Sequence, residues 1–185
     1  GETRRAYNVG PDALLVNFKA IDFRFVPGVD GVRVVGEPDF PNVEIASRVK
    51  PVAGPCNNWR RGLKVEIEEH GLLATVVVSG TYPVDCGEKT WPLSVFDADR
   101  YAEAALRWIW SETGGRFTGK VRAGAAPAGA TLFHRFESEP LAALVRDMNK
   151  FSNNVMARQL YLALSAQKGA PGEAAASERL VRAWL

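Results

Sequence analysis

The segment Ser152-Asn153-Asn154 holds the residue types best suited to chemistry in this 185-residue chain. A serine hydroxyl can donate and accept a hydrogen bond, and an asparagine side chain can do both toward a peptide group. The segment stands between two apolar patterns with helical spacing, so it is predicted to lie in a sharp break between two helices. These are also preferred capping residues, and capping of the second helix by Ser152 or one of the asparagines is the alternative explanation.

Two helices are predicted around this break, and a third closes the chain. The first is expected to be capped by Ser138, and the second is expected to run to Gly169, a natural helix stop. Residues 173–185 are predicted to form the last helix. The apolar positions of the first two helices are Leu141, Leu144, Val145 and Met148, followed by Val155, Met156, Leu160 and Ala163.

Alternation of apolar and polar residues predicts strands over most of residues 13–137. The clearest pattern is a β-hairpin over about residues 63–79, with a turn at Glu69-His70-Gly71. One helix is expected to begin after a cap at Asp97 and to end at Gly114-Gly115. The chain is therefore predicted to be α+β, with a β-rich region followed by a helical tail. The other expected strands lie within residues 13–26, 32–35, 43–49, 91–96, 116–122 and 131–136.

Composition restricts the kinds of partner that the chain can have. A hydrophobic content of 46%, with nine Phe and five Trp, fits a packed globular protein. The net charge of +2 is small and scattered, so no nucleic-acid partner is expected, and Trp59-Arg60-Arg61 with Lys64 is interpreted as an ordinary solvated turn. No run approaches the ~18 apolar residues of a membrane span. The cysteines and histidines form no metal-binding motif, so neither a metal nor another cofactor is expected. The polar residues 1–12 are predicted to be a linker, with any export signal removed or located upstream.

The residues around the break resemble one family closely. Residues 134–141, followed by residues 149–157, are similar to the region around the second active-site motif of class C low-molecular-mass penicillin-binding proteins, of the D-alanyl-D-alanine carboxypeptidase/endopeptidase type. Residues 13–18 and Val26-Pro27-Gly28 resemble the start of the inserted domains of that family. The resemblance covers nearly the whole chain. One departure is Arg158, where family members usually carry Glu.

This resemblance implies both a fold and a function. Residues 13–137 would be β-rich inserted domains, and residues 138–185 would be the helical part of an incomplete transpeptidase-like (serine β-lactamase-like) catalytic domain. In the S-x-N motif, catalytic Ser152 would relay a proton toward the leaving group, and Asn154 would be both catalytic and substrate-binding. The substrate would be the D-Ala-D-Ala end of peptidoglycan stem peptides in the periplasm or another extracytoplasmic space, and β-lactams would bind the intact enzyme. The alternative is a non-catalytic cell-wall or protein-binding module.

The family also uses a nucleophilic S-x-x-K motif and a K-T-G motif, and both are expected to lie outside this chain. Ser47-Arg48-Val49-Lys50 fits the first, but in a strand Ser47 and Lys50 point to opposite faces. Ser165-Ala166-Gln167-Lys168 closes a helix instead of opening one. Lys89-Thr90-Trp91 has Trp in place of Gly and precedes Ser152. The chain alone is therefore predicted to be inactive.

Two further expectations concern the cysteines and the end of the chain. Cys56 and Cys86 bracket the hairpin, which could bring them together, although their number alone settles nothing. With the extracytoplasmic location that the resemblance implies, they are expected to form a disulfide that contributes roughly 3–4 kcal/mol. Two reduced thiols are the alternative. The apolar Trp184-Leu185 end predicts a helical tail that is frayed or shielded by another copy of the chain.

Overall fold

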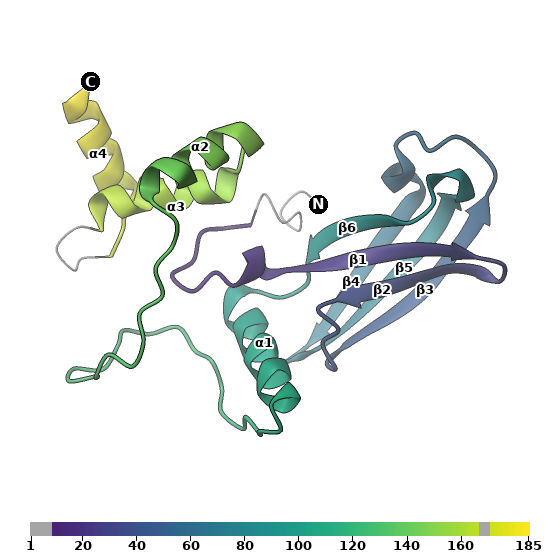
Figure 1. The fold of residues 1–185 in the computed structure, drawn as a ribbon, viewed down its shortest axis with the longest axis horizontal. Coiled ribbons are helices and arrows are strands. Elements are labelled where there is room, and N and C mark those ends of the chain that lie inside the picture. The colour runs from purple at the N-terminus through teal and green to yellow at the C-terminus, as the bar shows by residue number, and fades with distance from the viewer. Residues whose placement is uncertain (1–8, 167–170) are drawn as a thin grey trace. The chain divides into compact units, whose positions relative to one another are not determined.

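The computed structural model describes residues 9–166 and 171–185, and these residues form two compact units (Figure 1). The first unit comprises residues 14–122, and the second comprises residues 9–13 and 123–185. Within the described residues there are two three-stranded sheets and four α-helices, so the predicted α+β class is confirmed. Of the linker expected over residues 1–12, residues 1–8 lie outside the described residues.

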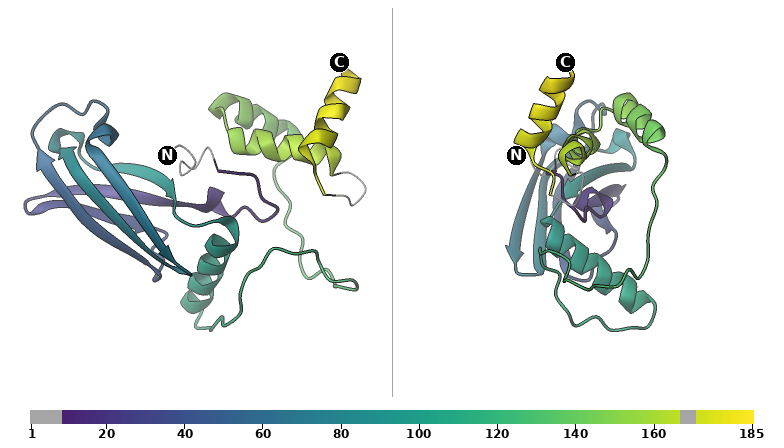
Figure 2. Two further views of the ribbon diagram at one scale, coloured as in Figure 1. Left: turned by 180° about the vertical axis from the view of Figure 1, so that it is seen from behind. Right: turned by 90° about the vertical axis from the view of Figure 1, so that its left-hand side faces the viewer.

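The first unit contains both sheets, shown from two further sides in Figure 2. One sheet has the order β2 (Gly31–Glu37), β1 (Ala20–Gly28), β6 (Lys89–Ser94), with antiparallel neighbours throughout. The other has the order β3 (Val43–Val52), β5 (Leu73–Pro83), β4 (Leu63–His70), with β3 parallel and β4 antiparallel to β5. Apolar residues of both sheets form one buried core, because each strand turns alternate side chains to the same face.

The predicted hairpin is confirmed as β4 and β5. Its strands pair from Leu63 opposite Gly80 to His70 opposite Leu73, and Gly71 in the turn has a φ of 65°. Burial alternates over the first part of β5, because Ala74, Val76 and Val78 are fully buried while their neighbours are at least partly exposed. The hairpin is therefore half-buried, with one face on the core.

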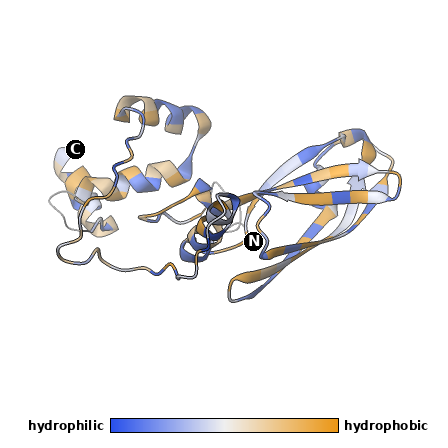
Figure 3. Ribbon diagram, turned by 60° about the horizontal axis from the view of Figure 1, so that its bottom comes forward, coloured by the Kyte–Doolittle hydropathy of each residue, from blue (hydrophilic) through white to orange (hydrophobic). Residues whose placement is uncertain are grey.

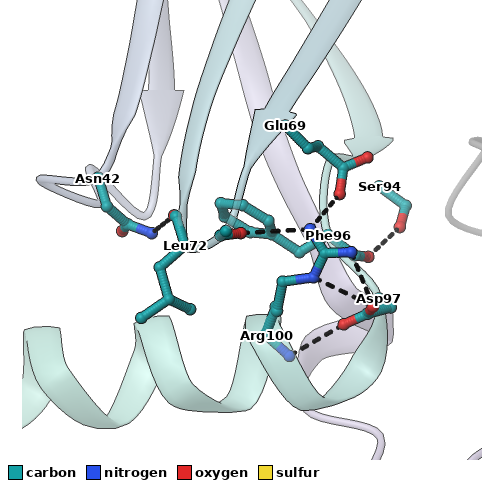
Figure 4. A network of polar contacts seen from close by, with 8 residues as sticks. Asn42, Glu69, Leu72, Ser94, Phe96, Asp97 and Arg100 are labelled. Atoms are coloured by element: carbon teal, nitrogen blue, oxygen red, sulfur yellow. Dashed lines mark hydrogen bonds and ion pairs between the residues drawn. The ribbon is translucent and has the colours of Figure 1, made fainter.

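Helix α1 (Ala98–Glu112) begins at the predicted cap, where Asp97 Oδ1 accepts a hydrogen bond from the backbone N–H of Arg100 at 3.0 Å. Figure 4 shows Arg100 extending from this turn toward the hairpin. Its guanidinium donates to Glu69 Oε2 at 2.7 Å and to the carbonyl oxygen of Gly71 at 3.2 Å. One side chain thus connects the start of α1 to the turn between β4 and β5.

A second charged side chain of α1 holds the segment that follows the helix. Glu103 is buried, and its carboxylate accepts hydrogen bonds from the guanidinium of Arg107 at 2.8 and 3.1 Å and from the backbone N–H of Val121 at 3.0 Å. Arg107 also donates to the carbonyl oxygens of Phe117 and Gly119, both at 2.8 Å. In this segment, which pairs with no described strand, side chains of α1 therefore supply the hydrogen bonds of the Phe117 and Gly119 carbonyls and of the Val121 N–H.

Four local predictions are wrong. The strands expected within residues 116–122 and 131–136 are absent, because a strand needs a hydrogen-bonded neighbour and the described residues offer these segments none. The first part of the expected strand 13–26 is irregular, with β1 starting only at Ala20. Ser138 does not cap a helix: its hydroxyl donates to the carbonyl oxygen of Glu139, and the helix begins after Pro140.

The second unit contains α2 (Leu141–Phe151), α3 (Asn154–Ser165) and α4 (Ala174–Trp184). The hydroxyl of the buried Ser177 donates to Ser165 Oγ at 2.8 Å and joins α4 to the end of α3. The predicted helix stop at Gly169 lies outside the described residues. These helices carry apolar stripes (Figure 3). Helix α4 continues to Trp184, which is 84% exposed, and the expectation that the tail is frayed or shielded by another copy stays a prediction.

Replacement of Glu103 by Gln is expected to destabilise the first unit by about 1–3 kcal/mol, because Arg107 would lose its charged acceptor. Burial alone would raise the pKa of Glu103, but hydrogen bonds from Arg107 and Val121 and the charges of Arg107 and Lys120 lower it overall. A folded-state pKa below the unfolded value gives stability that is present at neutral pH and is lost as the pH falls through the folded pKa.

Calorimetric midpoints of the chain between pH 7 and pH 3 measure this effect. The wild type should lose more stability on acidification than Glu103→Gln, and the exposed α1 substitution Glu112→Gln serves as the control. Equal pH dependence of the wild type and Glu103→Gln would show that the carboxylate contributes nothing specific.

Candidate functional site

Ser152 lies at the end of α2 in a backbone conformation that serine rarely adopts. Its φ and ψ are 50° and 46°, in the left-handed region. The backbone N–H groups of Ser152 and Asn153 both bond to the carbonyl oxygen of Met148, which ends the helix. Glycine is the usual residue at this position, and a side chain there costs roughly 1–2 kcal/mol. The break between the two helices is thus as sharp as predicted, and a residue with a hydroxyl occupies it.

Asn153 is the residue that caps α3. Its Oδ1 accepts hydrogen bonds from the backbone N–H groups of Val155 at 3.1 Å and Met156 at 3.0 Å. The capping explanation therefore holds for Asn153 and not for Ser152 or Asn154. Both of these side chains are exposed, and within the described part of the chain neither has a hydrogen-bond partner. The segment thus presents one hydroxyl and one amide that the fold itself does not use.

The neighbours of Ser152 include no base at helical spacing. The residues three and four positions later are Val155, which is fully buried, and Met156. Lys150 comes two residues earlier, and its Nζ lies 5.3 Å from the centre of the exposed Phe151 ring. A serine nucleophile needs an adjacent group that takes its proton. Ser152 therefore does not form an S-x-x-K arrangement with the residues that follow it.

The segments that resemble the S-x-x-K and K-T-G motifs in sequence do not lie in the positions that those motifs require. Ser47 and Lys50 lie within β3, and the Ser47 hydroxyl donates to the carbonyl oxygen of Val32 at 2.5 Å. Ser165 is the last residue of α3, and Lys168 lies outside the described residues. Lys89-Thr90-Trp91 opens β6, an edge strand of the first unit, whereas Ser152 belongs to the second.

Cys56 and Cys86 are joined in the structure, with an Sγ–Sγ distance of 2.04 Å and a Cα–Cα distance of 4.8 Å. Cys86 ends the 3-10 helix η5 (Val84–Cys86), and Cys56 precedes another, η4 (Trp59–Gly62). The bond thus ties together two loops at the same end of the hairpin.

Neither a metal site nor a membrane span emerges from the part of the chain that is described. Within it, no three His, Cys, Asp or Glu side chains gather in a group that could hold a metal ion. None of its helices combines the length and the apolar character that crossing a membrane requires.

Trp59-Arg60-Arg61 is more than the ordinary solvated turn that the sequence predicts, because these residues line an open hollow together with Asn58 and Trp91. The basic-aromatic run itself is the sequence signal for this hollow. The contribution of Trp91 could not be foreseen, because only the fold brings β6 beside η4.

Comparison with known proteins gives a family match and several similar solved structures. Residues 41–185 match the D-Ala-D-Ala carboxypeptidase 3 (S13) family. The crystal structure of penicillin binding protein 4 (dacB) from Haemophilus influenzae superposes with a TM-score of 0.70 and 18% sequence identity, over 98% of this chain and 41% of that one. The same protein complexed with a novel β-lactam gives a TM-score of 0.68 at 18% identity, over 95% and 41% of the two chains. The chain thus spans about two fifths of the length of these structures. None of the curated proteins compared with it matches its sequence.

Three neighbouring substitutions are expected to change stability in different directions. Ser152→Gly should stabilise the chain by up to about 1 kcal/mol, because glycine adopts the left-handed conformation without a side-chain penalty. Asn153→Ala should cost about 1 kcal/mol through loss of the cap. Asn154→Ala is the matched control and should cost nothing, because its side chain bonds to no described residue and alanine favours helix.

Urea unfolding followed by the helical circular dichroism signal gives the three free-energy changes. A destabilising Ser152→Gly, or an Asn153→Ala without effect, would contradict the assignment of strain and capping.

Proposed function

The chain belongs to the D-Ala-D-Ala carboxypeptidase 3 (S13) family, and from this premise we propose that it is part of a serine-type D-Ala-D-Ala carboxypeptidase or endopeptidase acting on peptidoglycan stem peptides. The observation that carries this proposal is the segment Ser152-Asn153-Asn154. Its middle residue is used by the fold, whereas the hydroxyl of Ser152 and the amide of Asn154 are free of hydrogen bonds to the described residues. A strained, exposed serine of this kind is typical of functional positions.

Cleavage of a D-Ala-D-Ala bond is an acyl transfer, which needs a nucleophile, a base and an oxyanion hole. In our proposal Ser152 relays a proton to the amine that leaves, and Asn154 donates to and accepts from a peptide group of the substrate. The nucleophilic S-x-x-K and the K-T-G motif lie outside this chain. The position of Ser47 in the middle of β3 supports this, as does the absence of a lysine at helical spacing after Ser152.

The two compact units support the proposal that the chain contains parts of two kinds of domain. Residues 13–137 are proposed to be inserted domains, and the unit of residues 14–122 has a hydrophobic core of its own. Residues 138–185 are proposed to belong to the catalytic domain. Their helices expose large apolar side chains, among them Leu141, Phe151 and Leu180, and the missing part of that domain would cover these.

The alternative function is a non-catalytic module that binds the cell wall or another protein. The basic-aromatic hollow beside η4 favours this alternative, because binding there needs none of the catalytic motifs. The encoding gene distinguishes the two. An S-x-x-K motif upstream and a K-T-G motif downstream support the enzyme, and their absence supports the binding module.

An extracytoplasmic location is part of the proposal, and it has a measurable consequence. Protein recovered from an oxidising compartment should contain no free thiol, because Cys56 and Cys86 lie within bonding distance. Thiol titration under denaturing, non-reducing conditions counts the free thiols. Two free thiols in such a sample would contradict the disulfide.

In the intact enzyme, Ser152→Ala should slow hydrolysis of a D-Ala-D-Ala peptide by roughly 10²–10⁴-fold, the usual value of a positioned proton transfer. Stability should change little, because Asn153 supplies the cap. Steady-state kinetics with a D-Ala-D-Ala peptide measure the effect, and Ser138→Ala, which removes an exposed hydroxyl of the same unit, is the control. Wild-type rates in Ser152→Ala would remove Ser152 from the mechanism.

The 185-residue chain by itself should neither hydrolyse such peptides nor form a covalent adduct with penicillin. Ser152 has no lysine at helical spacing, and Ser47 lies within a strand. Incubation with a fluorescent penicillin, followed by a denaturing gel and intact mass measurement, tests this expectation. A stoichiometric adduct on any serine of this chain would contradict it.

A further inference from the structure

An open hollow of about 520 Å³ lies in the first unit and is lined by Asn58, Trp59, Arg60, Arg61 and Trp91. We call it the η4 hollow. A second hollow of about 360 Å³ shares three of these residues and extends over Thr81 and Pro83. Ligand sites commonly have volumes of about 300–1,000 Å³. Each of the two neighbouring hollows is therefore large enough for part of an extended ligand and larger than a small ion requires.

Two tryptophans form the apolar part of the hollow. The Trp59 and Trp91 rings meet edge to face, with centres 6.1 Å apart. The core also fixes the Trp59 ring, whose centre lies 5.3 Å from that of the Phe25 ring and 5.5 Å from that of the Tyr82 ring. The guanidinium of Arg60 lies 5.2 Å from the centre of the Trp59 ring and 5.7 Å from that of Trp91. Cation–π attraction thus holds one positive charge at the junction of the two rings.

The charge of the hollow is not balanced by its surroundings. The side chains of Arg60 and Arg61 are both exposed, and within the described part of the chain neither forms an ion pair or a hydrogen bond. A guanidinium presents five N–H donors in one plane and matches a carboxylate with two parallel hydrogen bonds. Two such groups beside indole rings point to a ligand with a carboxylate and an apolar face.

The loop that carries these arginines is held in place before any ligand binds. The Cys56–Cys86 disulfide ties its start to η5. Its end approaches β5 closely: a Cβ on Gly80, where φ is 110°, would lie 2.1 Å from the carbonyl oxygen of Gly62. Only glycine fits there. A loop fixed at both ends loses little entropy on binding, which favours affinity.

We propose that the η4 hollow binds a carboxylate-bearing disaccharide-peptide of peptidoglycan, a choice of polymer that rests on the proposed function. The stem peptides supply free carboxylates for Arg60 and Arg61, and the sugar rings supply apolar C–H faces for the indoles. Both components belong to one extended polymer, which matches a surface longer than a single anion needs. A nucleic acid fits less well, because the chain carries a net charge of only +2.

Sedimentation of the 185-residue chain with purified peptidoglycan sacculi, freed of attached proteins and secondary polymers, tests the proposal. The wild type should sediment with the sacculi, and the double variant Arg60→Gln/Arg61→Gln should bind at least tenfold more weakly. The matched control, Arg33→Gln/Arg48→Gln, removes two charges from exposed positions of the same unit and should bind like the wild type. Arg60→Lys keeps the charge but not the two-pronged geometry, so its binding should be intermediate.

A second arm changes the ligand and leaves the protein intact. Amidation of the sacculus carboxylates should weaken wild-type binding and should not weaken the double variant further. The proposal is overturned if the wild type does not sediment, if the control loses as much binding as the double variant, or if polyphosphate or DNA competes as well as a soluble disaccharide-peptide.

Penicillin acylation of the intact protein reports on the proposed function independently, and the double variant should be acylated like the wild type. Failure of one proposal is thus distinguishable from failure of the other.

Discussion

The contact of Phe25 with Tyr82 and Trp59 is the interaction on which the first unit depends. The Phe25 ring stacks on Tyr82 with centres 5.7 Å apart and meets the edge of Trp59 at 5.3 Å. Phe25 belongs to one sheet and Tyr82 to the other, so this contact joins the two halves of the core. Aromatic pairs of this geometry are worth about 0.5–1.5 kcal/mol beyond the area that they bury. The same contact fixes η4, and with it Arg60 and Arg61, at one edge of the core.

The helical unit depends on a different constraint, which is the way its chain reverses between α2 and α3. The side chain of Asn153 caps the start of α3, and Ser152 adopts the strained left-handed conformation that ends α2. This division of roles explains how neighbouring polar residues can serve both the fold and chemistry. Helix capping is stabilising, and the strain at Ser152 is a cost that packing and capping must offset.

Elements with their own periodicity could be predicted from the sequence. The hairpin, the Asp97 cap and the helices around Ser152 all follow from local spacing, and the structure contains each of them. The strands expected within residues 116–122 and 131–136 are absent, because alternation does not reveal whether a partner strand exists. The first of these segments is held instead by side chains of α1: the Glu103 carboxylate accepts from the backbone N–H of Val121, and the Arg107 guanidinium donates to the carbonyl oxygen of Gly119. The η4 hollow could not be predicted for a related reason, since its two tryptophans, Trp59 and Trp91, are far apart in sequence and local patterns do not show that they meet. The S-x-N segment could be found, because all of its residues are adjacent.

The central claim is that Ser152 and Asn154 belong to the catalytic apparatus of a larger S13 enzyme, and a crystal structure of the intact protein acylated by penicillin tests it most directly. The account predicts that Ser152 Oγ and the side-chain amide of Asn154 lie within hydrogen-bonding distance, roughly 2.6–3.2 Å, of the bound adduct or of the attacking serine. An adduct whose polar contacts come from other residues, with Ser152 and Asn154 facing solvent, would contradict the claim.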